Sequence, residues 1–342
     1  MAKAGQDTRF KKLYLNYFST KFEAVYVFSY AGERVDGLPT NVKVISNKYN
    51  LHRFIYGLLI PFLNYKFIKK CDVFRAYHIL GTMPAVVSKI FFNKKFVFNY
   101  GYDYVEFAKI EGKMLQILLI KIISPLAFFT ASKIIATTKF AFQFIPRSKS
   151  VFIPNGVDTK LFKPYPQKHI RKRLKLLNIG RLEPQKNQIN LVKAMKGISA
   201  DLLILGNGSL ENQIIEEAKR LGVNLKILEK IDNSKLPAIY NDADIFVLPS
   251  LTEGPVKVLI EAMSCGLPVI GSRARGINEV IINGKTGYFC LTSAQSIKKA
   301  LNSLIEDKSL RSVLGKNARK LIVDKFDLDK LLEQEVAVMH SL

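Results

Sequence analysis

Residues 245–290 read IFVLPSLTEGPVKVLIEAMSCGLPVIGSRARGINEVIINGKTGYFC, and the expected fold follows from this stretch. Two short apolar runs within it, residues 245–248 and 268–271, show no polar alternation, which is typical of buried parallel strands. Between them, residues 255–265 have the length and apolar content of a helix that ends at Gly266. The pattern predicts a strand, a loop, a helix and a second strand. In open α/β sheets, ligands bind at the carboxyl ends of such strands.

Two glutamates lie in this unit with seven residues between them. Glu253 stands in the loop before the helix, and Gly254 after it would let a ligand approach the backbone closely. Glu261 lies inside the helix among apolar neighbours. Because burying a bare carboxylate is costly, Glu261 is expected to face a cleft or a partner. Taken singly, each glutamate also fits an ordinary solvated position.

The segment resembles the donor-sugar site of retaining GT-B glycosyltransferases, the large family that includes sucrose synthases and many mannosyltransferases. The family pattern is E-G-x-P-x-x-x-x-E-A-M-x-x-G-x-P-V. Residues 253–269 read E-G-P-V-K-V-L-I-E-A-M-S-C-G-L-P-V, so the proline comes one place early. The resemblance implies that Glu253 contacts the transferred sugar and that Glu261 holds the ribose of the nucleotide. It also places three neighbouring residues against the donor: Gly254, Pro255 and Val256.

The chain has 342 residues, of which 48% are hydrophobic. This length suggests about two domains, each with a proper core. The three cysteines, Cys71, Cys265 and Cys290, form no C-x-x-C pair. Neither a disulfide framework nor a zinc site is therefore indicated, and a reducing cytoplasm is expected. Residues 1–15 do not read as a signal peptide, because charges interrupt them before any long apolar run.

The net charge is +24, and it is concentrated in the first part of the chain. Residues 1–150 hold 23 Lys and Arg against 8 Asp and Glu, a balance of +15, whereas the remainder holds 29 against 20, or +9. A basic surface attracts polyanions or an anionic membrane leaflet. A generally lysine-rich composition is the alternative explanation. With no tryptophan, tandem aromatic RNA motif or finger spacing, no specific nucleic acid is expected.

The first 160 residues alternate between predicted helices and predicted strands, which implies a parallel, doubly wound sheet. Strands are expected at residues 24–28, 42–45, 72–75 and 95–99, and helices at residues 8–22, 51–69 and 84–91. In the family, a strand and a glycine-rich loop normally precede the opening helix. The first domain is therefore expected to lack its first strand.

Residues 115–136, LQILLIKIISPLAFFTASKIIA, are the most apolar stretch and are long enough to suggest a membrane span. Lys121 and Pro125 interrupt the stretch, and a short β-branched run ends it. A core helix followed by a strand is therefore the prediction. Lysine-flanked aromatic segments at residues 58–70 and 91–96 suggest a surface that docks on a leaflet without spanning it.

Tyr100 follows the strand at residues 95–99, where family members often carry a histidine that faces the reacting sugar. Asp103 lies close by, so either residue is a candidate for that contact, and Asp103 is taken as the catalytic candidate. The alternative for Asp103 is a turn, which its neighbour Gly101 favours. His78, at the end of a strand, fits a structural role better than a place in the cleft.

The domain boundary is expected within residues 148–166, where prolines mark a linker. The string I-P-N-G-V-D at residues 153–158, followed by F-x-P, resembles the family's interdomain segment. The resemblance implies that Asn155 faces the cleft between the domains.

The second domain opens with LLNIGRLEPQKN at residues 176–187, which reads as a strand, a glycine turn and a helix start. A diphosphate needs cations and free backbone N–H groups, and such a turn supplies both. The family string G-R-L-x-x-x-K matches here, which implies that Gly180, Arg181 and Lys186 hold the diphosphate. On its own, a basic pair after a strand is more often surface charge.

Three further loops resemble family features. Gly206 and Gly208 match a G-x-G that lets the nucleotide lie close to the backbone. The strand expected at residues 227–231 ends where the family binds the base, which implies a contact at Ile231. Residues 274–279, ARGINE, resemble the loop G-G-x-x-E, with Arg275 in place of the first glycine.

The sequence therefore predicts an α/β protein of the GT-B fold, with two doubly wound Rossmann-like domains facing across a cleft. Residues 1–160 would form the acceptor-side domain and residues 161–325 the domain that binds the nucleotide-sugar. Residues 326–342 would form a helix that crosses back to the first domain.

The expected function is transfer of a sugar from a UDP- or GDP-linked donor to an acceptor hydroxyl with retained anomeric configuration. Glycan, glycolipid or cell-envelope polysaccharide synthesis would be the setting, in the cytoplasm or at the inner face of the membrane, with a glycan or lipid-linked acceptor. No metal or other cofactor is expected, because Arg181 and Lys186 would replace a metal. The alternative is a membrane- or polyanion-binding protein that keeps the fold without the chemistry.

Overall fold

The computed structural model describes residues 10–30, 36–110, 112–166, 172–229 and 231–342. The chain divides into two compact units: Met1–Pro154 together with Leu332–Leu342, and Asn155–Leu331. These limits lie six residues before and six residues after the boundaries predicted at residues 160 and 325. Each unit is an α/β structure built on parallel strands, as the sequence predicts.

The second unit contains a six-stranded parallel sheet with the order β12-β11-β10-β7-β8-β9. Its strands are β7 (Leu174–Ile179), β8 (Ala200–Leu205), β9 (Leu225–Leu228), β10 (Ile245–Leu248), β11 (Val269–Ser272) and β12 (Tyr288–Cys290). The chain adds β8 and β9 on one side of β7, and β10, β11 and β12 on the other. The order of the strands therefore reverses between β7 and β10, which is the point where open α/β sheets bind their ligands.

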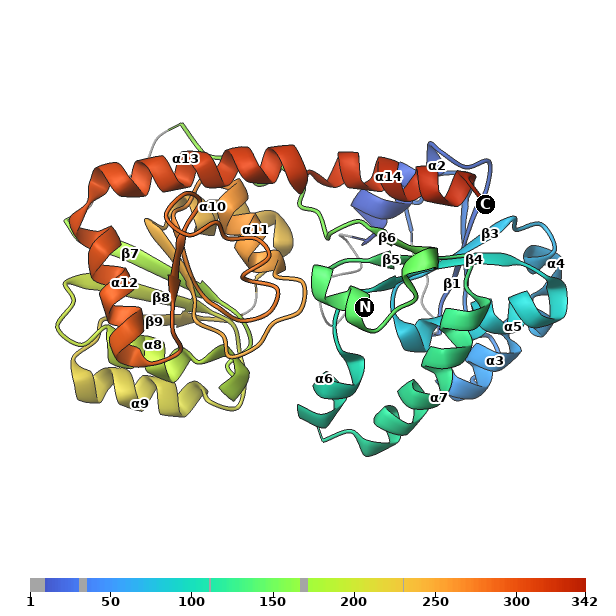
Figure 1. The fold of residues 1–342 in the computed structure, drawn as a ribbon, viewed down its shortest axis with the longest axis horizontal. Helices are drawn as coiled ribbons and strands as arrows, with labels where there is room; N and C mark the ends of the chain where they lie inside the picture. Colours follow the sequence, from blue (N-terminus) through green and yellow to red (C-terminus); the bar gives the residue numbers. More distant parts are fainter. Residues whose placement is uncertain (1–9, 31–35, 111, 167–171, 230) are drawn as a thin grey trace. The chain divides into compact units, whose positions relative to one another are not determined.

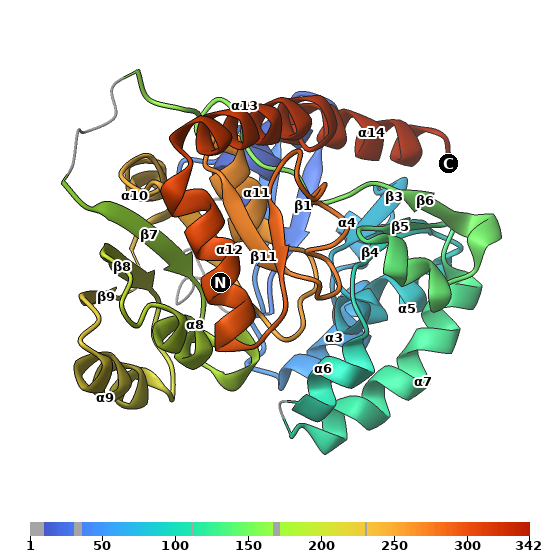
Figure 2. The ribbon, with the colours of Figure 1, turned by 60° about the vertical axis from the view of Figure 1, so that its left-hand side comes forward.

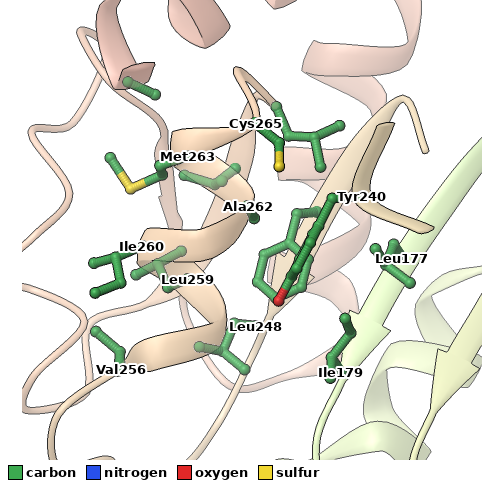
Figure 3. Packing of buried hydrophobic residues seen from close by; sticks show 14 of the residues in the cluster. Leu177, Ile179, Tyr240, Leu248, Val256, Leu259, Ile260, Ala262, Met263 and Cys265 are labelled. Atoms are coloured by element: carbon green, nitrogen blue, oxygen red, sulfur yellow. The ribbon is translucent and has the colours of Figure 1, made fainter. Parts of the chain in front are cut away.

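Helices cover both faces of this sheet, as Figures 1 and 2 show. They are η6 (Pro184–Lys186), α8 (Gln188–Ala194), α9 (Glu211–Leu221), η7 (Asn233–Lys235), α10 (Leu236–Asn241), α11 (Lys257–Ser264), α12 (Ala294–Glu306) and α13 (Lys308–Lys325). Successive residues of a strand point to opposite faces. Leu177 accordingly joins one buried cluster with α10 and α11, and Leu176 joins the other with α8 and α12. Figure 3 shows part of the first cluster, where α11 packs against Tyr240.

The first unit holds a four-stranded parallel sheet and a separate two-stranded one. The larger has the order β3 (Val73–Ala76), β4 (Lys95–Tyr100), β5 (Lys133–Ala136) and β6 (Ser150–Phe152). The smaller pairs β1 (Val25–Phe28) with β2 (Val42–Ile45). In a doubly wound sheet the first strand lies between the second and the fourth. The split between the two sheets falls where such a strand would lie.

The helices of the first unit are η2 (Phe10–Leu15), α2 (Asn16–Ser19), α3 (Arg53–Leu63), α4 (Tyr65–Ile68), η3 (Ile79–Thr82), α5 (Met83–Phe92), α6 (Tyr104–Ile110), α7 (Met114–Thr130), η4 (Lys139–Gln143) and η5 (Arg147–Lys149). The last helix, α14 (Leu328–His340), begins in the second unit and ends in the first. Within the first unit, Glu335 accepts hydrogen bonds from Arg75 in an ion pair of 2.7 Å. The ring of His340 stacks on Phe22 at 5.1 Å. The end of the final helix thus belongs to the first unit.

The most apolar stretch forms α7 followed by β5, which confirms a helix and a strand in place of one long span. Across the described ranges of the chain, no helix combines the length and the apolar character needed to cross a bilayer.

Three predicted elements differ from the structure. The strand expected at residues 227–231 lies at Leu225–Leu228, because β9 pairs in register with β8 and ends where that strand ends. The helix expected at residues 51–69 is interrupted at Asn64, between α3 and α4. The opening helix is described from Phe10, and its first six residues are π-helical; residues 8 and 9 of that prediction lie outside the described residues.

Candidate active site

The carboxyl ends of β7 and β10 lie next to each other at the reversal point of the second sheet. The loop after β7 leads to Lys186, and the loop after β10 leads to Glu253. Lys186 Nζ lies 2.5 Å from Glu253 Oε1, and the two side chains are 15% and 10% exposed. Two residues that the sequence singled out from separate motifs therefore form one ion pair in a partly desolvated position.

Ser250 holds the Glu253 carboxylate in place. The Ser250 hydroxyl donates to Glu253 Oε1 at 2.7 Å, and the whole serine is buried. The Ser250 carbonyl accepts a hydrogen bond of 2.5 Å from Ser272 at the end of β11. Gln185 also donates to the carbonyl of Thr252 at 2.8 Å. The sequence did not indicate Ser250 or Gln185, because a serine after a strand and a glutamine in a turn carry no distinguishing signal.

The loop after β7 is fixed by Asn187. This residue adopts a left-handed backbone conformation with φ of 60°, which asparagine tolerates better than most residues. Its Nδ2 donates to the carbonyls of Pro249 at 3.0 Å and Thr292 at 2.8 Å. The start of α8 is thereby tied to the end of β10, and Lys186 is held beside Glu253. Gly180 leaves room for the Lys186 side chain, which would lie 3.4 Å from a Cβ at that position.

The glycines of the predicted nucleotide loops have a packing role. A Cβ on Gly206 would lie 1.9 Å from the Gly180 carbonyl oxygen, and one on Gly208 would lie 2.4 Å from that of Leu182. A Cβ on Gly276 would lie 2.0 Å from the Gly254 carbonyl oxygen. The loops after β7 and β8 therefore touch backbone to backbone, as do the loops after β10 and β11.

Gly206→Ala is expected to lower the free energy of unfolding of the second unit by about 3 kcal/mol, because it adds strain at φ +155° to a backbone clash. The matched control is Gly222→Ala, where φ is +65° and nothing lies within 4 Å of the added Cβ. That change should cost only about 1 kcal/mol. Urea unfolding of the full chain measures both. Equal losses would show that the two loops do not pack as described.

Glu261 is 2% exposed and finds the partner that its apolar surroundings require. Its Oε2 accepts a hydrogen bond of 3.0 Å from the hydroxyl of Tyr240 in α10, which is itself fully buried. Figure 3 shows Tyr240 between α11 and the strands. Burial, aided by the charge of Glu261, raises the pKa of the nearby Cys265 thiol to about 12. The sequence did not indicate Tyr240, since an aromatic residue in a short apolar helix reads as ordinary core.

The remaining predicted donor residues occupy varied positions. Val256 is buried and Ile231 is partly buried, and both pack in the cluster shown in Figure 3. Pro255 is partly buried, whereas Arg181 is exposed at the rim of the β7 loop. Asn155 is partly buried beside Gly156, where an added Cβ would lie 2.8 Å from the Cα of Leu328 at the start of α14.

The candidates of the first unit have identifiable structural roles. Asp103 Oδ1 accepts hydrogen bonds from the backbone N–H groups of Val105 and Glu106, both at 3.0 Å, and so caps α6. Tyr100 is buried in an aromatic cluster, and this burial raises the pKa of its hydroxyl. His78 Nδ1 accepts from the N–H of Gly81 at 3.0 Å, and burial lowers the pKa of its ring. The turn considered for Asp103 is present, and its contact with a sugar stays a prediction.

Within the residues that the structure describes, no group of three or more His, Cys, Asp or Glu side chains is arranged to hold a metal ion.

Residues 162–321 match the family described as glycosyl transferases group 1. Among curated proteins, the chain is 33% identical over 211 residues to the UDP-Gal:alpha-D-GlcNAc-diphosphoundecaprenol alpha-1,3-galactosyltransferase of Escherichia coli, which covers 56% of this chain and 54% of that protein. It is 29% identical over 212 residues to the GDP-mannose-dependent alpha-(1-6)-phosphatidylinositol monomannoside mannosyltransferase of Mycolicibacterium smegmatis, covering 55% and 56%. The chain thus spans about half the length of these relatives.

Solved structures resemble the chain over most of its length. Sucrose-phosphate synthase from Thermosynechococcus elongatus superposes with a TM-score of 0.84 at 20% identity, covering 99% of this chain and 93% of that one. An Anabaena protein in complex with UDP and glucose gives a TM-score of 0.72 at 22% identity, covering 89% and 87%. At these identities the likeness concerns the fold alone, and it confirms the expected GT-B fold.

Proposed function

Because the second unit of this chain is a glycosyl transferases group 1 domain, we propose that the protein transfers a sugar from a nucleotide-sugar to an acceptor hydroxyl. The ion pair between Lys186 and Glu253 at the reversal point of the sheet carries the proposal. Within this pair, the Lys186 cation is suited to bind a diphosphate, and the Glu253 carboxylate beside it is suited to accept hydrogen bonds from sugar hydroxyls. A UDP- or GDP-linked donor is supported by the names of the similar proteins, which use one or the other.

Arg181 and Lys186 act on the leaving group. The hard step is departure of the nucleoside diphosphate, on which negative charge grows as the bond to the sugar breaks. Lys186, in a partly desolvated position, is a preorganised cation that stabilises such charge, and the exposed Arg181 adds its own charge from the same loop. They take the place of a metal ion, and the reaction as proposed needs no resident cofactor. Gly180, Gly206 and Gly208 bring the backbone of the two neighbouring loops close to the diphosphate and the nucleoside.

Glu253 and Glu261 hold the two ends of the donor. Glu253 accepts hydrogen bonds from the sugar hydroxyls, next to Gly254, and Ser250 keeps its carboxylate oriented. Glu261 accepts from the ribose hydroxyls, with Tyr240 fixing its other side. We assign the base to a contact with Ile231, keep Asp103 as the candidate for a contact with the transferred sugar, and keep Asn155 as a candidate donor-binding residue. Charged acceptors make the stronger hydrogen bonds to hydroxyl groups, which favours carboxylates in both places.

The proposed transfer retains the anomeric configuration. The bond between the anomeric carbon and the diphosphate oxygen breaks, and its electron pair goes to the diphosphate. The acceptor oxygen forms the new bond on the same face of the sugar, and its proton passes to the departing diphosphate. The products are the glycosylated acceptor and the protonated nucleoside diphosphate, so the atoms and charges of the reaction balance.

The acceptor is proposed to be a glycan or a lipid-linked sugar, in glycan, glycolipid or cell-envelope polysaccharide synthesis. The two similar proteins named above act on a diphosphoundecaprenol-linked sugar and on a phosphatidylinositol monomannoside. We place the reaction in the cytoplasm, where the three unpaired cysteines would stay reduced.

A panel of UDP- and GDP-sugars tests the function. The purified chain should bind either UDP or GDP. With the matching nucleotide-sugar it should release that diphosphate slowly when water is the acceptor and faster when a lipid-linked acceptor is added. NMR of the product bond distinguishes retention from inversion. A folded chain that binds neither UDP nor GDP would instead be a membrane- or polyanion-binding protein that keeps the fold without the chemistry.

A further inference from the structure

Helix α7 is apolar on two opposite sides. Its inner side buries Ile117, Ile120 and Ile123 against the four-stranded sheet. Its outer side exposes six large apolar residues: Met114, Leu115, Leu118, Ile122, Leu126 and Phe129. At 100° per residue these six fall within one third of the helix circumference. Phe129 is 82% exposed, the highest value among the exposed large hydrophobic residues of the described chain. A helix that is apolar all round is normally covered on every side, so this outer side calls for a partner.

Two neighbouring helices extend the apolar surface. Helix α3 packs against α5, and α5 packs against α7, so the three helices lie side by side, as Figures 1 and 2 show. Their exposed residues include Leu58, Phe62 and Leu63 on α3 and Ile90 and Phe91 on α5. The rings of Phe62 and Phe91 are in contact at 5.2 Å, which joins the two helices at the surface. We call the exposed apolar residues of these three helices together the α3–α5–α7 face.

The charge around the α3–α5–α7 face has one sign. Residues 53–70, 83–95 and 113–130 contain nine Lys or Arg and no Asp or Glu. Lys113, the N-cap residue of α7, and Lys121, within α7, are both exposed. At the other end of α7, Lys149 donates to the carbonyl of Phe129 at 2.6 Å and lies 5.9 Å from its ring. An apolar surface that is bordered by cations and exposes Phe62, Phe91 and Phe129 suits the boundary between lipid headgroups and acyl chains.

We propose that the α3–α5–α7 face docks on the surface of an anionic lipid bilayer. The exposed side chains enter the headgroup and acyl boundary, and the lysines pair with anionic headgroups. A second copy of the chain is disfavoured as the occupant, because two such faces would bring like charges together without an acidic residue to offset them. The inference goes beyond the proposed transfer and does not rest on it, since it concerns a surface formed by the first unit alone.

Sedimentation of the full chain with vesicles tests the proposal. Binding should be strong at low salt to vesicles of phosphatidylglycerol and phosphatidylcholine in equal parts, and weak to phosphatidylcholine alone. Raising the salt should weaken binding, because it screens the charges. Replacing Leu118, Ile122 and Phe129 together by serine should reduce binding by roughly tenfold or more, since the apolar area no longer enters the lipid. Lys113→Ala and Lys121→Ala should each reduce it about fivefold.

The matched controls lie in the second unit. Leu291→Ser and Val313→Ser remove apolar side chains that are 62% and 50% exposed and should leave vesicle binding unchanged. Circular dichroism and urea unfolding check that every variant folds. Equal binding to both vesicle types, wild-type binding by the triple serine variant, or loss of binding by the control variants would overturn the proposal. The proposal would also be overturned if the wild-type chain did not bind vesicles. In that case, a loss of self-association in the triple serine variant would identify a second copy of the chain as the partner of this face.

Discussion

Lys186→Ala is expected to cut sugar transfer by roughly hundredfold or more and to weaken binding of the nucleoside diphosphate. The reason is electrostatic. Lys186 Nζ lies in a position only 15% exposed, so its charge is poorly screened by water and acts strongly on a diphosphate at the same loop. Removing one preorganised group of this kind costs about 10²–10³ in turnover. Steady-state kinetics with the matching donor and a titration with the free diphosphate measure the two effects.

The structure also identifies the competing explanation. Without Lys186, the Glu253 carboxylate keeps its hydrogen bond from Ser250 and loses its counter-ion. An unpaired, partly buried charge destabilises a fold. The double variant Lys186→Ala with Glu253→Gln removes that charge and should regain stability but not diphosphate affinity. Lys193→Ala is the matched control, because it removes an exposed lysine from α8 nearby. Unchanged kinetics in a folded Lys186→Ala protein would rule out the phosphate role.

Variants of the two glutamates should differ in their affinity for the nucleoside diphosphate. Glu261→Gln is expected to weaken the diphosphate and the nucleotide-sugar alike, because both carry the ribose that Glu261 is proposed to hold. Losing a hydrogen bond to a charged acceptor costs about 1.5–3 kcal/mol, or roughly ten- to a hundredfold in affinity. Glu253→Gln is expected to depress transfer by a similar factor.

Glu253→Gln should spare or slightly raise the affinity for the free diphosphate. The change removes a negative charge beside Lys186, so the lysine no longer has to leave a carboxylate to meet the phosphate. Glu306→Gln, at an exposed position of α12, is the control and should change neither quantity. Tyr240→Phe removes only the hydroxyl that holds Glu261, and it should weaken the nucleotide less than Glu261→Gln does. Equal losses of diphosphate affinity in the two glutamate variants would contradict the donor-site assignment.

Most helices and strands of the second unit could be predicted from local patterns in the sequence. The strand predicted at residues 245–248 is β10, and the helix predicted at residues 255–265 contains α11. These elements are local: a short unbroken apolar run has few uses other than a buried strand, and glycine or proline ends each segment through its own backbone constraints. The motifs around Glu253 and Lys186 could likewise each be identified from the sequence, independently of the other.

The contacts between these motifs depend on the tertiary structure. Lys186 and Glu253 are 67 residues apart in the chain, and they meet because β7 and β10 become neighbours in the sheet. Ser250 supports Glu253 and Tyr240 supports Glu261 through hydrogen bonds between residues that the fold brings together, and no local sequence pattern indicates either pair. Strand order is set by how the whole chain packs, which no local pattern records.

The first unit shows the same limit from the other side. The apolar character of α7 was evident from its sequence, but a helix that is apolar all round gives no indication of which side is buried. The sheet below and α5 beside it cover one side of α7 and leave the side with Phe129 exposed. Composition fixes how much apolar surface a helix has, whereas the neighbours that the fold brings to it fix how much of that surface remains for a partner.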